Sequence, residues 1–498
     1  MLHLVDCSLL TPPRADPDGR SRYVMLEMLR AYGAGLLAAA GEQDAAAAAL
    51  AGYTLGVARQ AAAGLDTSTG EVAAARWLDA EDATTRQVLS WALQHDAAIA
   101  LRLAVALAPW WLLRGRLVSQ WPLLREAAGH AAPGGNAWYA AQFWLGTAVL
   151  SSADLAGALR HFTSIRDAAG DRGGSRALAD ALIGRSVALA NMGRIAEAVD
   201  DGRRALYLSR DCGYPAGEVQ ALVYLAVAAY FVGDLDLAVE LAVQAEQVPA
   251  DLPGQLVRLR SIFVADVLMA SGDLAEAERV CAAGLAQARD VGDTQNLARV
   301  LTLMAMLEIR SGRITGATAH LREALQISAR TGNQLQLALE NGLDCCAHLC
   351  VATGRWAEAA TVWAAHTALL RYEAPATAPA RMRRRQELLR EARQALGPAR
   401  ARSAVDRGAA MSWATAAEYA LMLTDPGPQP AAPGPGTLSA RERELVTLVA
   451  RGRTNAEIAA QLYISVSTVS SHLDRIRDKT GCRRRADLTR LALTMGLV

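Results

Sequence analysis

A short turn recurs through the middle of the chain at nearly constant spacing. The six turn residues are Ala153, Gly193, Gly233, Gly272, Gly312 and Gly354, which are 40, 40, 39, 40 and 42 residues apart, and each precedes an alanine-containing stretch. A fixed period of this size indicates a solenoid, because each unit can bury its apolar face only against its neighbours. The sequence therefore predicts an array of helical hairpins.

Small residues accompany every turn, seven positions before it and five after it. The pairs are Gly146/Ala158, Ser186/Ala198, Ala226/Ala238, Ala265/Ala277, Ala305/Ala317 and Ala347/Ala359. Twelve residues apart across a tight turn, they would let two antiparallel helices approach closely. The pattern from about Trp138 to Tyr372 resembles the tetratricopeptide repeat, although the period exceeds that family's 34 residues. Such an array implies a concave groove for an unknown protein, peptide or small-molecule effector; the alternative is a spacer.

Length and composition predict several soluble domains. The chain has 498 residues, of which 52% are apolar and 20% charged, as in globular proteins. No uncharged, proline-free window of about 18 residues predicts a membrane span, and the N-terminus lacks a basic signal-peptide region. Seven cysteines, an odd number, fit a reducing compartment. We therefore expect a cytoplasmic protein with no membrane partner.

The last 62 residues, 437–498, differ from the rest in charge and are preceded by a linker. They carry 11 basic and 6 acidic residues, whereas the remainder carries 40 and 44. The segment 425–436 contains five prolines and three glycines, which excludes a helix there. This arrangement favours a small basic module that meets DNA, joined to a mildly acidic body.

Capping signals in this module predict closely spaced helices. Ser439 with Glu442, and Thr454 with Glu457, have the spacing of capping boxes, and Ser465 can cap a third helix. In that third helix Val466, Val469, Leu473 and Ile476 form an apolar stripe that we expect to face inward. Two capped helices joined by a short turn predict a helix-turn-helix.

The whole of Leu438–Leu491 resembles the LuxR/GerE-type DNA-binding domain, through L-S-A-R-E-R-E-L, G-R-T-N-A-E-I-A, L-Y-I-S-V-S-T-V-S-S-H-L and I-R-D-K-T-G. The resemblance implies four helices, the third in the major groove of double-stranded DNA and the fourth able to join two copies as a homodimer. Combining the exposed positions of the third helix with those that the family implies, we expect DNA contacts from Arg453, Thr454, Asn455, Ser467, Thr468, Ser470, Ser471, Asp474, Arg475 and Lys479.

Two of these positions depart from the family. Ser470 and Asp474 stand where basic residues are common, which weakens the expected attraction to phosphates. The leading hypothesis is a transcription regulator whose repeat array receives a signal. The alternative is a repeat-based adaptor in which a degenerate DNA-binding module serves protein contacts.

The first 37 residues resemble the end of the winged-helix segment in large ATP-binding LuxR regulators. We expect a strand in Leu4–Leu10, a loop with Pro12 and Pro13, and a strand leading into a helix. A P-loop needs a lysine on the phosphates, and the single lysine, Lys479, lies in the basic module. From this resemblance we expect the chain to begin where an ATPase would have ended. A truncated relative, a misassigned start and one half of a split regulator are the three alternatives.

No other motif predicts catalysis, so we expect no enzyme, no cofactor and no metal site. Cys345, Cys346, His348 and Cys350 are interpreted as helix-packing residues rather than ligands. The predicted fold is all-α. Its expected parts are a winged-helix remnant (1–40), a helical region (41–135), a tetratricopeptide-like array (136–424), the linker (425–436) and the four-helix DNA-binding domain (437–498).

Overall fold

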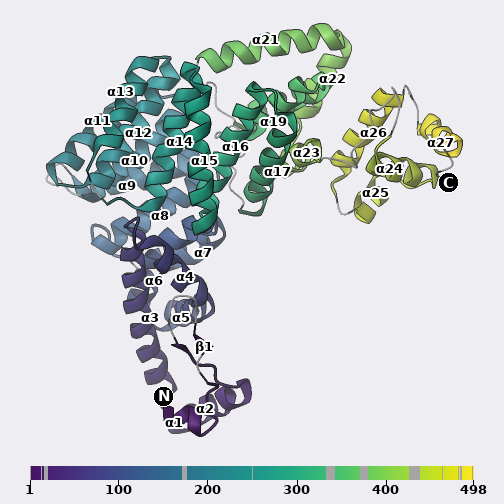
Figure 1. Ribbon diagram of the computed structural model, residues 1–498. Coiled ribbons are helices and arrows are strands. Elements are labelled where there is room, and N and C mark those ends of the chain that lie inside the picture. The colour runs from purple at the N-terminus through teal and green to yellow at the C-terminus, as the bar shows by residue number, and fades with distance from the viewer. Residues whose placement is uncertain are drawn as a thin grey trace.

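The protein is helical from end to end in the computed structural model (Figure 1). The residues described are 2–12, 14–15, 21–129, 131–170, 176–249, 251–331, 342–370, 379–425, 438–462, 464–480, 482, 485–495 and 497. Within them, strands are limited to one antiparallel pair of two residues each. The structure therefore confirms the all-α class. The predicted linker 425–436 lies outside the described residues, except for Asp425.

A small hairpin and one short helix precede the long front helices. These elements are α1 (Leu2–Asp6), β1 (Arg14–Ala15), β2 (Ser21–Arg22), α2 (Glu27–Ala40), α3 (Gln43–Leu65), α4 (Glu71–Ala80), α5 (Asp82–His95), α6 (Ala97–Leu113) and α7 (Leu117–Ala128). The prediction of a strand in Leu4–Leu10 was wrong, because this segment begins as α1. A strand needs a partner, and the pairing found here is a single bridge from Leu10 to Met25.

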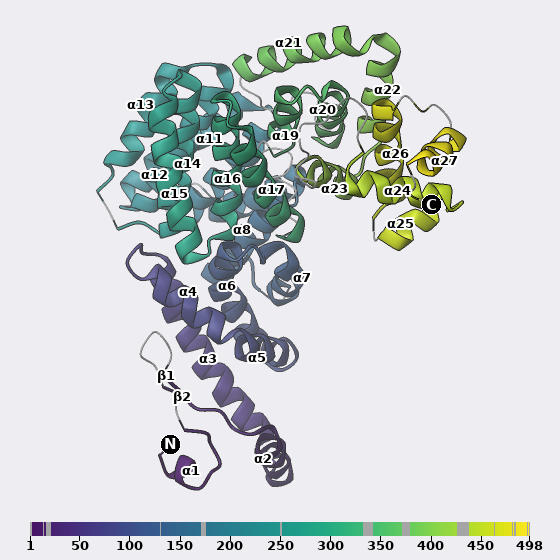
Figure 2. The ribbon, with the colours of Figure 1, turned by 45° about the vertical axis from the view of Figure 1, so that its right-hand side comes forward.

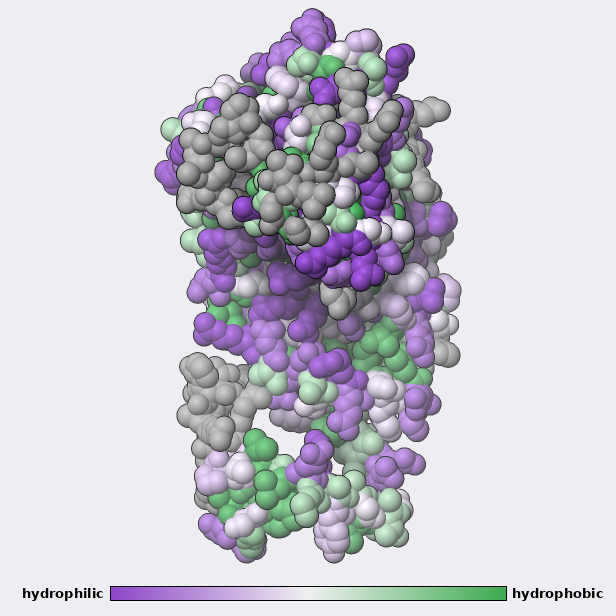
Figure 3. All heavy atoms as spheres, turned by 90° about the vertical axis from the view of Figure 1, so that its right-hand side faces the viewer, coloured by the Kyte–Doolittle hydropathy of each residue, from purple (hydrophilic) through white to green (hydrophobic). Residues whose placement is uncertain are grey.

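Exposed apolar side chains gather around this hairpin. Val24, Leu26, Met28 and Tyr32 are between 56% and 85% exposed. The space-filling view shows an apolar area at the end of the molecule where the chain begins (Figure 3). The winged-helix interpretation of residues 1–40 remains a prediction.

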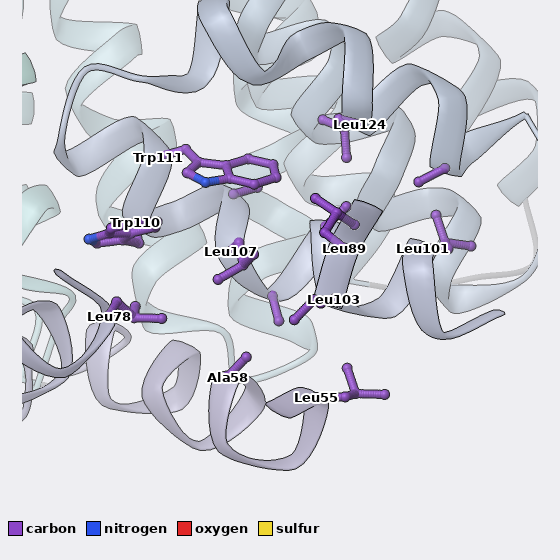
Figure 4. Packing of buried hydrophobic residues seen from close by; sticks show 14 of the residues in the cluster. Leu55, Ala58, Leu78, Leu89, Leu101, Leu103, Leu107, Trp110, Trp111 and Leu124 are labelled. Atoms are coloured by element: carbon purple, nitrogen blue, oxygen red, sulfur yellow. The ribbon is translucent and has the colours of Figure 1, made fainter. Parts of the chain in front are cut away.

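The front helices share one core that is rich in tryptophan. Trp110 and Trp111 of α6 are buried, and they pack among leucines from α3, α4, α5 and α7 (Figure 4). The Trp110 indole N–H donates to Asp79 Oδ1 at 2.9 Å, which satisfies the polar edge of a ring that is otherwise out of water. Helices α3 to α7 thus pack around one shared core, to which α8 also contributes.

The middle of the chain is the repeat array. Its helices pair as α8 (Asn136–Ser151) with α9 (Leu155–Ala169), α10 (Arg176–Asn191) with α11 (Ile195–Asp211), α12 (Pro215–Val232) with α13 (Leu235–Gln247), α14 (Gly254–Ser271) with α15 (Leu274–Val291), α16 (Thr294–Arg310) with α17 (Ile314–Thr331), and α19 (Gly342–Ala352) with α20 (Trp356–Leu370).

The sequence pattern of the repeats is confirmed in detail. All six predicted turn residues, Ala153 included, have φ between 60° and 96°, the left-handed region that tight helix–helix turns require. The small residues paired across the six turns are all buried. In one pair the Ser186 hydroxyl donates to the Ala198 carbonyl at 2.7 Å, so a short side chain of one helix reaches the backbone of the other.

Three further helices end the array, and four form the C-terminal module. They are α21 (Pro379–Leu396), α22 (Pro398–Ala409) and α23 (Trp413–Leu423), then α24 (Ala440–Ala450), α25 (Asn455–Leu462), α26 (Val466–Thr480) and α27 (Arg485–Thr494). The module has a separate core that includes Leu445, Ile458, Val469 and Leu488. Figures 1 and 2 place it beside the last array helices, with α26 near α22 and α23.

A buried charge network joins the front helices to the array. Arg258 of α14 donates two hydrogen bonds of 2.7 Å to Glu71 of α4, and its Nε bonds Asp293 at 2.7 Å. All three side chains are at most 4% exposed. Nearby, Arg114, the residue that follows α6, donates to the carbonyls of Val291 and Gly292 at 2.6 and 2.8 Å. These contacts close the start of the chain onto the fourth hairpin of the array.

Among the described residues, one helix is long and apolar enough to cross a membrane. This helix is α12, and 56% of its apolar window is buried inside the protein. It lies between α10, α11, α13 and α14, as expected of an inner helix in a solenoid.

Candidate DNA-binding interface

The helices of the C-terminal module begin at the predicted caps. Ser439 and Glu442 form a complete capping box, with Glu442 N–H donating to Ser439 Oγ and Ser439 N–H to Glu442 Oε2. Thr454 and Glu457 exchange the same pair of bonds at the start of α25. Ser465 Oγ accepts from the Thr468 N–H at 3.0 Å, which caps α26. Both capping boxes and the third cap are therefore confirmed.

The buried face of α26 differs from the prediction at one end. Val469, Leu473 and Ile476 are buried in the module core, as expected. Val466 is 48% exposed, so its assignment to the inward stripe was wrong. It is the first residue of the helix and lies beyond the edge of the core that the other three fill.

The opposite face of α26 presents short polar side chains. Ser467 is exposed and Ser471 half-buried. Ser470 is turned toward α25, where its Oγ accepts from Asn455 Nδ2 at 3.2 Å. The Asn455 Oδ1 in turn accepts from Arg485 Nη1 at 2.8 Å, and Arg485 also bonds the Arg453 carbonyl. Predicted contact residues from two helices are thus linked with Arg485, which begins the fourth helix.

Asp474 is paired within its own helix. Its Oδ1 accepts from Arg477 Nη1 at 2.7 Å, one turn further along. The partner of this acid is therefore Arg477 rather than its sequence neighbour Arg475. Spacings of three and four residues place side chains on the same helix face, whereas adjacent residues diverge.

Lys479 and Arg475 converge on one buried acid. Lys479 Nζ lies 2.7 Å from Glu442 Oε1, and Arg475 Nε lies 3.8 Å from the same oxygen. Burial alone would raise the pKa of Glu442, but bonds from Lys479 and the Ser439 N–H outweigh it and hold the pKa below its usual value. Two cations expected at DNA phosphates therefore also hold α26 against α24.

The array covers part of α26. Thr468 Oγ1 donates to Glu418 Oε2 of α23 at 3.0 Å, and Thr468 is only 3% exposed. Arg475 Nε lies 3.7 Å from Glu358 Oε1 of α20. At the far end Arg400 of α22 donates to Asp478 Oδ1 at 2.6 Å. Two predicted DNA-contacting residues are thus occupied by acidic side chains of the array.

The remaining predicted contact residues lie at the surface of the module. Arg453 and Thr454 are exposed, and Arg453 lies 3.7 Å from Glu457. The sequence did not single out Glu442, Arg477, Glu358 or Glu418 as members of the site. The sequence did carry a signal for Glu442, because its spacing from Ser439 correctly predicted a capping box. The sequence carried no such signal for Glu358 and Glu418, because only the folded chain brings α20 and α23 next to α26.

The arrangement of α25 and α26 defines a helix-turn-helix DNA-binding domain. Residues 436–492 match the family described as bacterial regulatory proteins, luxR family. A Mycobacterium tuberculosis protein named as the transcriptional regulatory protein NarL is 47% identical over 58 residues, 12% of this chain and 27% of that protein. The C-terminal module is therefore a LuxR-family helix-turn-helix domain.

A longer similarity reaches beyond this domain. A Mycobacterium bovis protein named as an HTH-type transcriptional regulator is 27% identical over 279 residues, which cover 55% of this chain and 30% of that protein. The chain thus matches less than a third of this relative's length. A solved Rap protein complexed with competence and sporulation factor overlaps 68% of this chain and 99% of its own, at 14% identity and a TM-score of 0.40.

Proposed function

We propose that the chain is a cytoplasmic, DNA-binding transcription regulator whose recognition helix is α26. The observation that carries this proposal is the face formed by Ser467 and Ser471, which is left open beside Asn455 and Arg485 on a capped LuxR-family domain. Hydroxyl side chains on such a helix can bond base edges in the major groove, while arginines on its flanks bind phosphates. The adaptor alternative has no observation that favours it over this one.

The docked position of α26 suggests how binding is controlled. Glu418 and Glu358 hold Thr468 and Arg475 through the hydrogen-bond and charge interactions that DNA phosphates would otherwise make. Phosphate attraction supplies much of the affinity for DNA, so the docked chain binds weakly. We propose that the regulator binds its operator when α26 leaves α20, α22 and α23, and that an effector in the array drives this change.

A homodimer on DNA is part of the proposal. In this domain family the fourth helix joins two copies, and here α27 contributes Leu488 and Ala492 to the module core. The partly buried Leu491 lies one residue before Ala492 and is the side chain we assign to the dimer contact. Two recognition helices related by a two-fold axis would then read an inverted repeat.

A selection from random duplex DNA tests the function directly. The full-length chain should enrich one sequence, and Ser467→Ala with Ser471→Ala should lose that preference while keeping its melting temperature. The matched control is Ser403→Ala with Thr415→Ala in α22 and α23, which should leave the selected sequence unchanged. Retention of DNA without any enriched sequence would contradict the proposal and favour the adaptor.

A further inference from the structure

A large cavity lies between the front helices and the inner helices of the array. Its volume is about 830 Å³, and its walls come from α3, α4 and α6 on one side and from α8, α10, α12, α14 and α16 on the other. Trp144, Tyr139 and Tyr224 contribute aromatic surface to it. Pockets of roughly 300–1,000 Å³ with apolar walls and a few polar groups are the usual size and character of small-ligand sites.

Most of the charged groups of the wall have partners within the protein. Glu71 is bound by Arg258, and Asp251 accepts from the Ser68 hydroxyl at 2.7 Å. Arg176 lies 4.0 Å from Asp180, and burial raises the pKa of that acid to about 6 despite the nearby arginine. A charged ligand would have to displace one of these pairs. The cavity therefore favours a neutral ligand.

Two polar atoms in the wall lack partners among the described residues. They are the Gln255 amide nitrogen on α14 and the Asn296 amide oxygen on α16, and both atoms are buried. Asn296 is 3% exposed, and its Nδ2 donates to the Gln255 carbonyl at 3.1 Å and to Asp293 Oδ2 at 2.8 Å. These two bonds fix which end of the Asn296 amide is nitrogen, and they leave its oxygen without a donor.

Buried polar groups in folded proteins are nearly always hydrogen-bonded, because leaving one unpaired is unfavourable. Here an unpaired donor and an unpaired acceptor lie on adjacent inner helices of the same cavity. One group complements both, an amide, whose carbonyl accepts from Gln255 and whose N–H donates to Asn296. Both atoms belong to side chains that line the cavity, so one amide of a ligand bound there could pair with both.

We propose that this cavity binds a neutral, apolar compound that carries an amide, either a short peptide or a small non-peptide amide. The proposal rests on the proposed function, for which it supplies the effector site. Asn296 also links the cavity to the buried charge network of Arg258, Glu71 and Asp293, called the closing network below. Asp293 accepts hydrogen bonds from both Asn296 and Arg258. A bound amide would therefore brace the junction between the front helices and the array.

Calorimetric titration of the full-length chain without DNA tests the proposal. The probes are acetyl-Phe-Leu-amide, N-(2-phenylethyl)hexanamide and the ester 2-phenylethyl hexanoate, which has the shape of the second probe but no N–H. At least one amide should bind saturably and more tightly than the ester, and the tighter amide identifies the source as peptide or non-peptide. Equal binding of amide and ester, or no saturable binding by either amide, would overturn the proposal.

A variant tests whether the probe binds at the unpaired nitrogen of Gln255. Gln255→Met removes the donor while keeping the side-chain length, so it should weaken amide binding about 2- to 10-fold, the loss expected for one neutral hydrogen bond. Its melting temperature without ligand should not fall. The control Gln244→Met on α13 lies outside the cavity and should bind as the natural chain does. Unchanged binding by Gln255→Met would place the probe elsewhere and contradict the site. Because no DNA is present, failure here leaves the DNA selection unaffected.

Discussion

The array and the C-terminal module are both helical, yet they are held together in different ways. The array packs small residues, mostly alanine, across its turns, so its helices lie close enough for a serine side chain to reach the facing backbone. The module is built from leucine, isoleucine and valine around one small core, and polar caps set where its helices begin. The array thus gains its shape from repetition, and the module from a few specific side chains. A single substitution should accordingly reduce stability most where the repeats meet a different part of the chain, at the contact between the array and the front helices.

The largest effect is expected at the closing network of the array. Arg258→Met leaves Glu71 and Asp293 buried without a cation, which should destabilise the chain by about 3–5 kcal/mol. The free energy of unfolding in urea measures this loss. Arg279→Met is the matched control, because Arg279 forms an exposed pair with Glu276 and its loss should not be detectable. Equal stability of both variants would mean that the repeats alone hold the array closed.

The next effect concerns the contact between the two regions. Glu358→Gln with Glu418→Gln should weaken docking of α26 and raise the DNA affinity of the full-length chain by roughly 10-fold, the equivalent of about 1.4 kcal/mol. Affinity is measured at one fixed salt concentration, because the phosphate contribution depends on salt. Glu323→Gln, which removes an exposed pair with Arg289 elsewhere in the array, should leave it unchanged. Unaltered affinity in the double variant would show that docking does not limit binding.

A smaller effect should appear in the pH dependence of the module. Because the pKa of Glu442 is lower in the folded state, its stabilising contribution is complete above the ordinary pKa of glutamate and is lost as pH falls through the lowered value. Melting temperatures followed from pH 7 downward should fall less steeply in Glu442→Gln than in the natural chain. Glu444→Gln, an exposed acid on the same helix, serves as the control. Parallel curves would exclude Glu442 as the titrating group.

The smallest effect is expected at Asp474. Its removal frees Arg477 for phosphate, so Asp474→Ala should tighten binding to all sequences alike, by about 1 kcal/mol or less. The affinities of the selected site and of its single-base variants measure this. Loss of discrimination at one base pair, by roughly 1–3 kcal/mol, would instead show that the acid reads a base.

The sequence predicted the parts of this structure that depend on local chemistry. The turns at Gly193 and Gly233 follow from the backbone freedom of glycine, and the caps at Ser439 and Thr454 follow from hydroxyl and carboxyl groups three residues apart. Such features need no knowledge of distant residues. The wrong strand near the N-terminus involved a segment whose conformation depends on which partner it meets.

The most extensive features that escaped prediction join residues far apart in the chain. Thr468 and its partner Glu418 are 50 residues apart, and Arg258 and Glu71 are 187 residues apart. Nothing in the spacing of the repeats says where the solenoid closes or which of its acids face the module. The unpaired amides of Gln255 and Asn296 were hidden for the same reason, since their lack of partners is a property of the packed wall.

The closing network also has a consequence for the order of events during synthesis. Glu71 leaves the ribosome well before Arg258, and at about 5–20 residues per second the 187 intervening residues take roughly 10–40 s to be made. Throughout that interval the Glu71 carboxylate lacks the Arg258 guanidinium that neutralises it in the folded chain. The front helices already share their core with α8, but they cannot contact the fourth hairpin until α14 and α15 have been made. A nascent chain therefore passes through a form that is open at this junction before it closes.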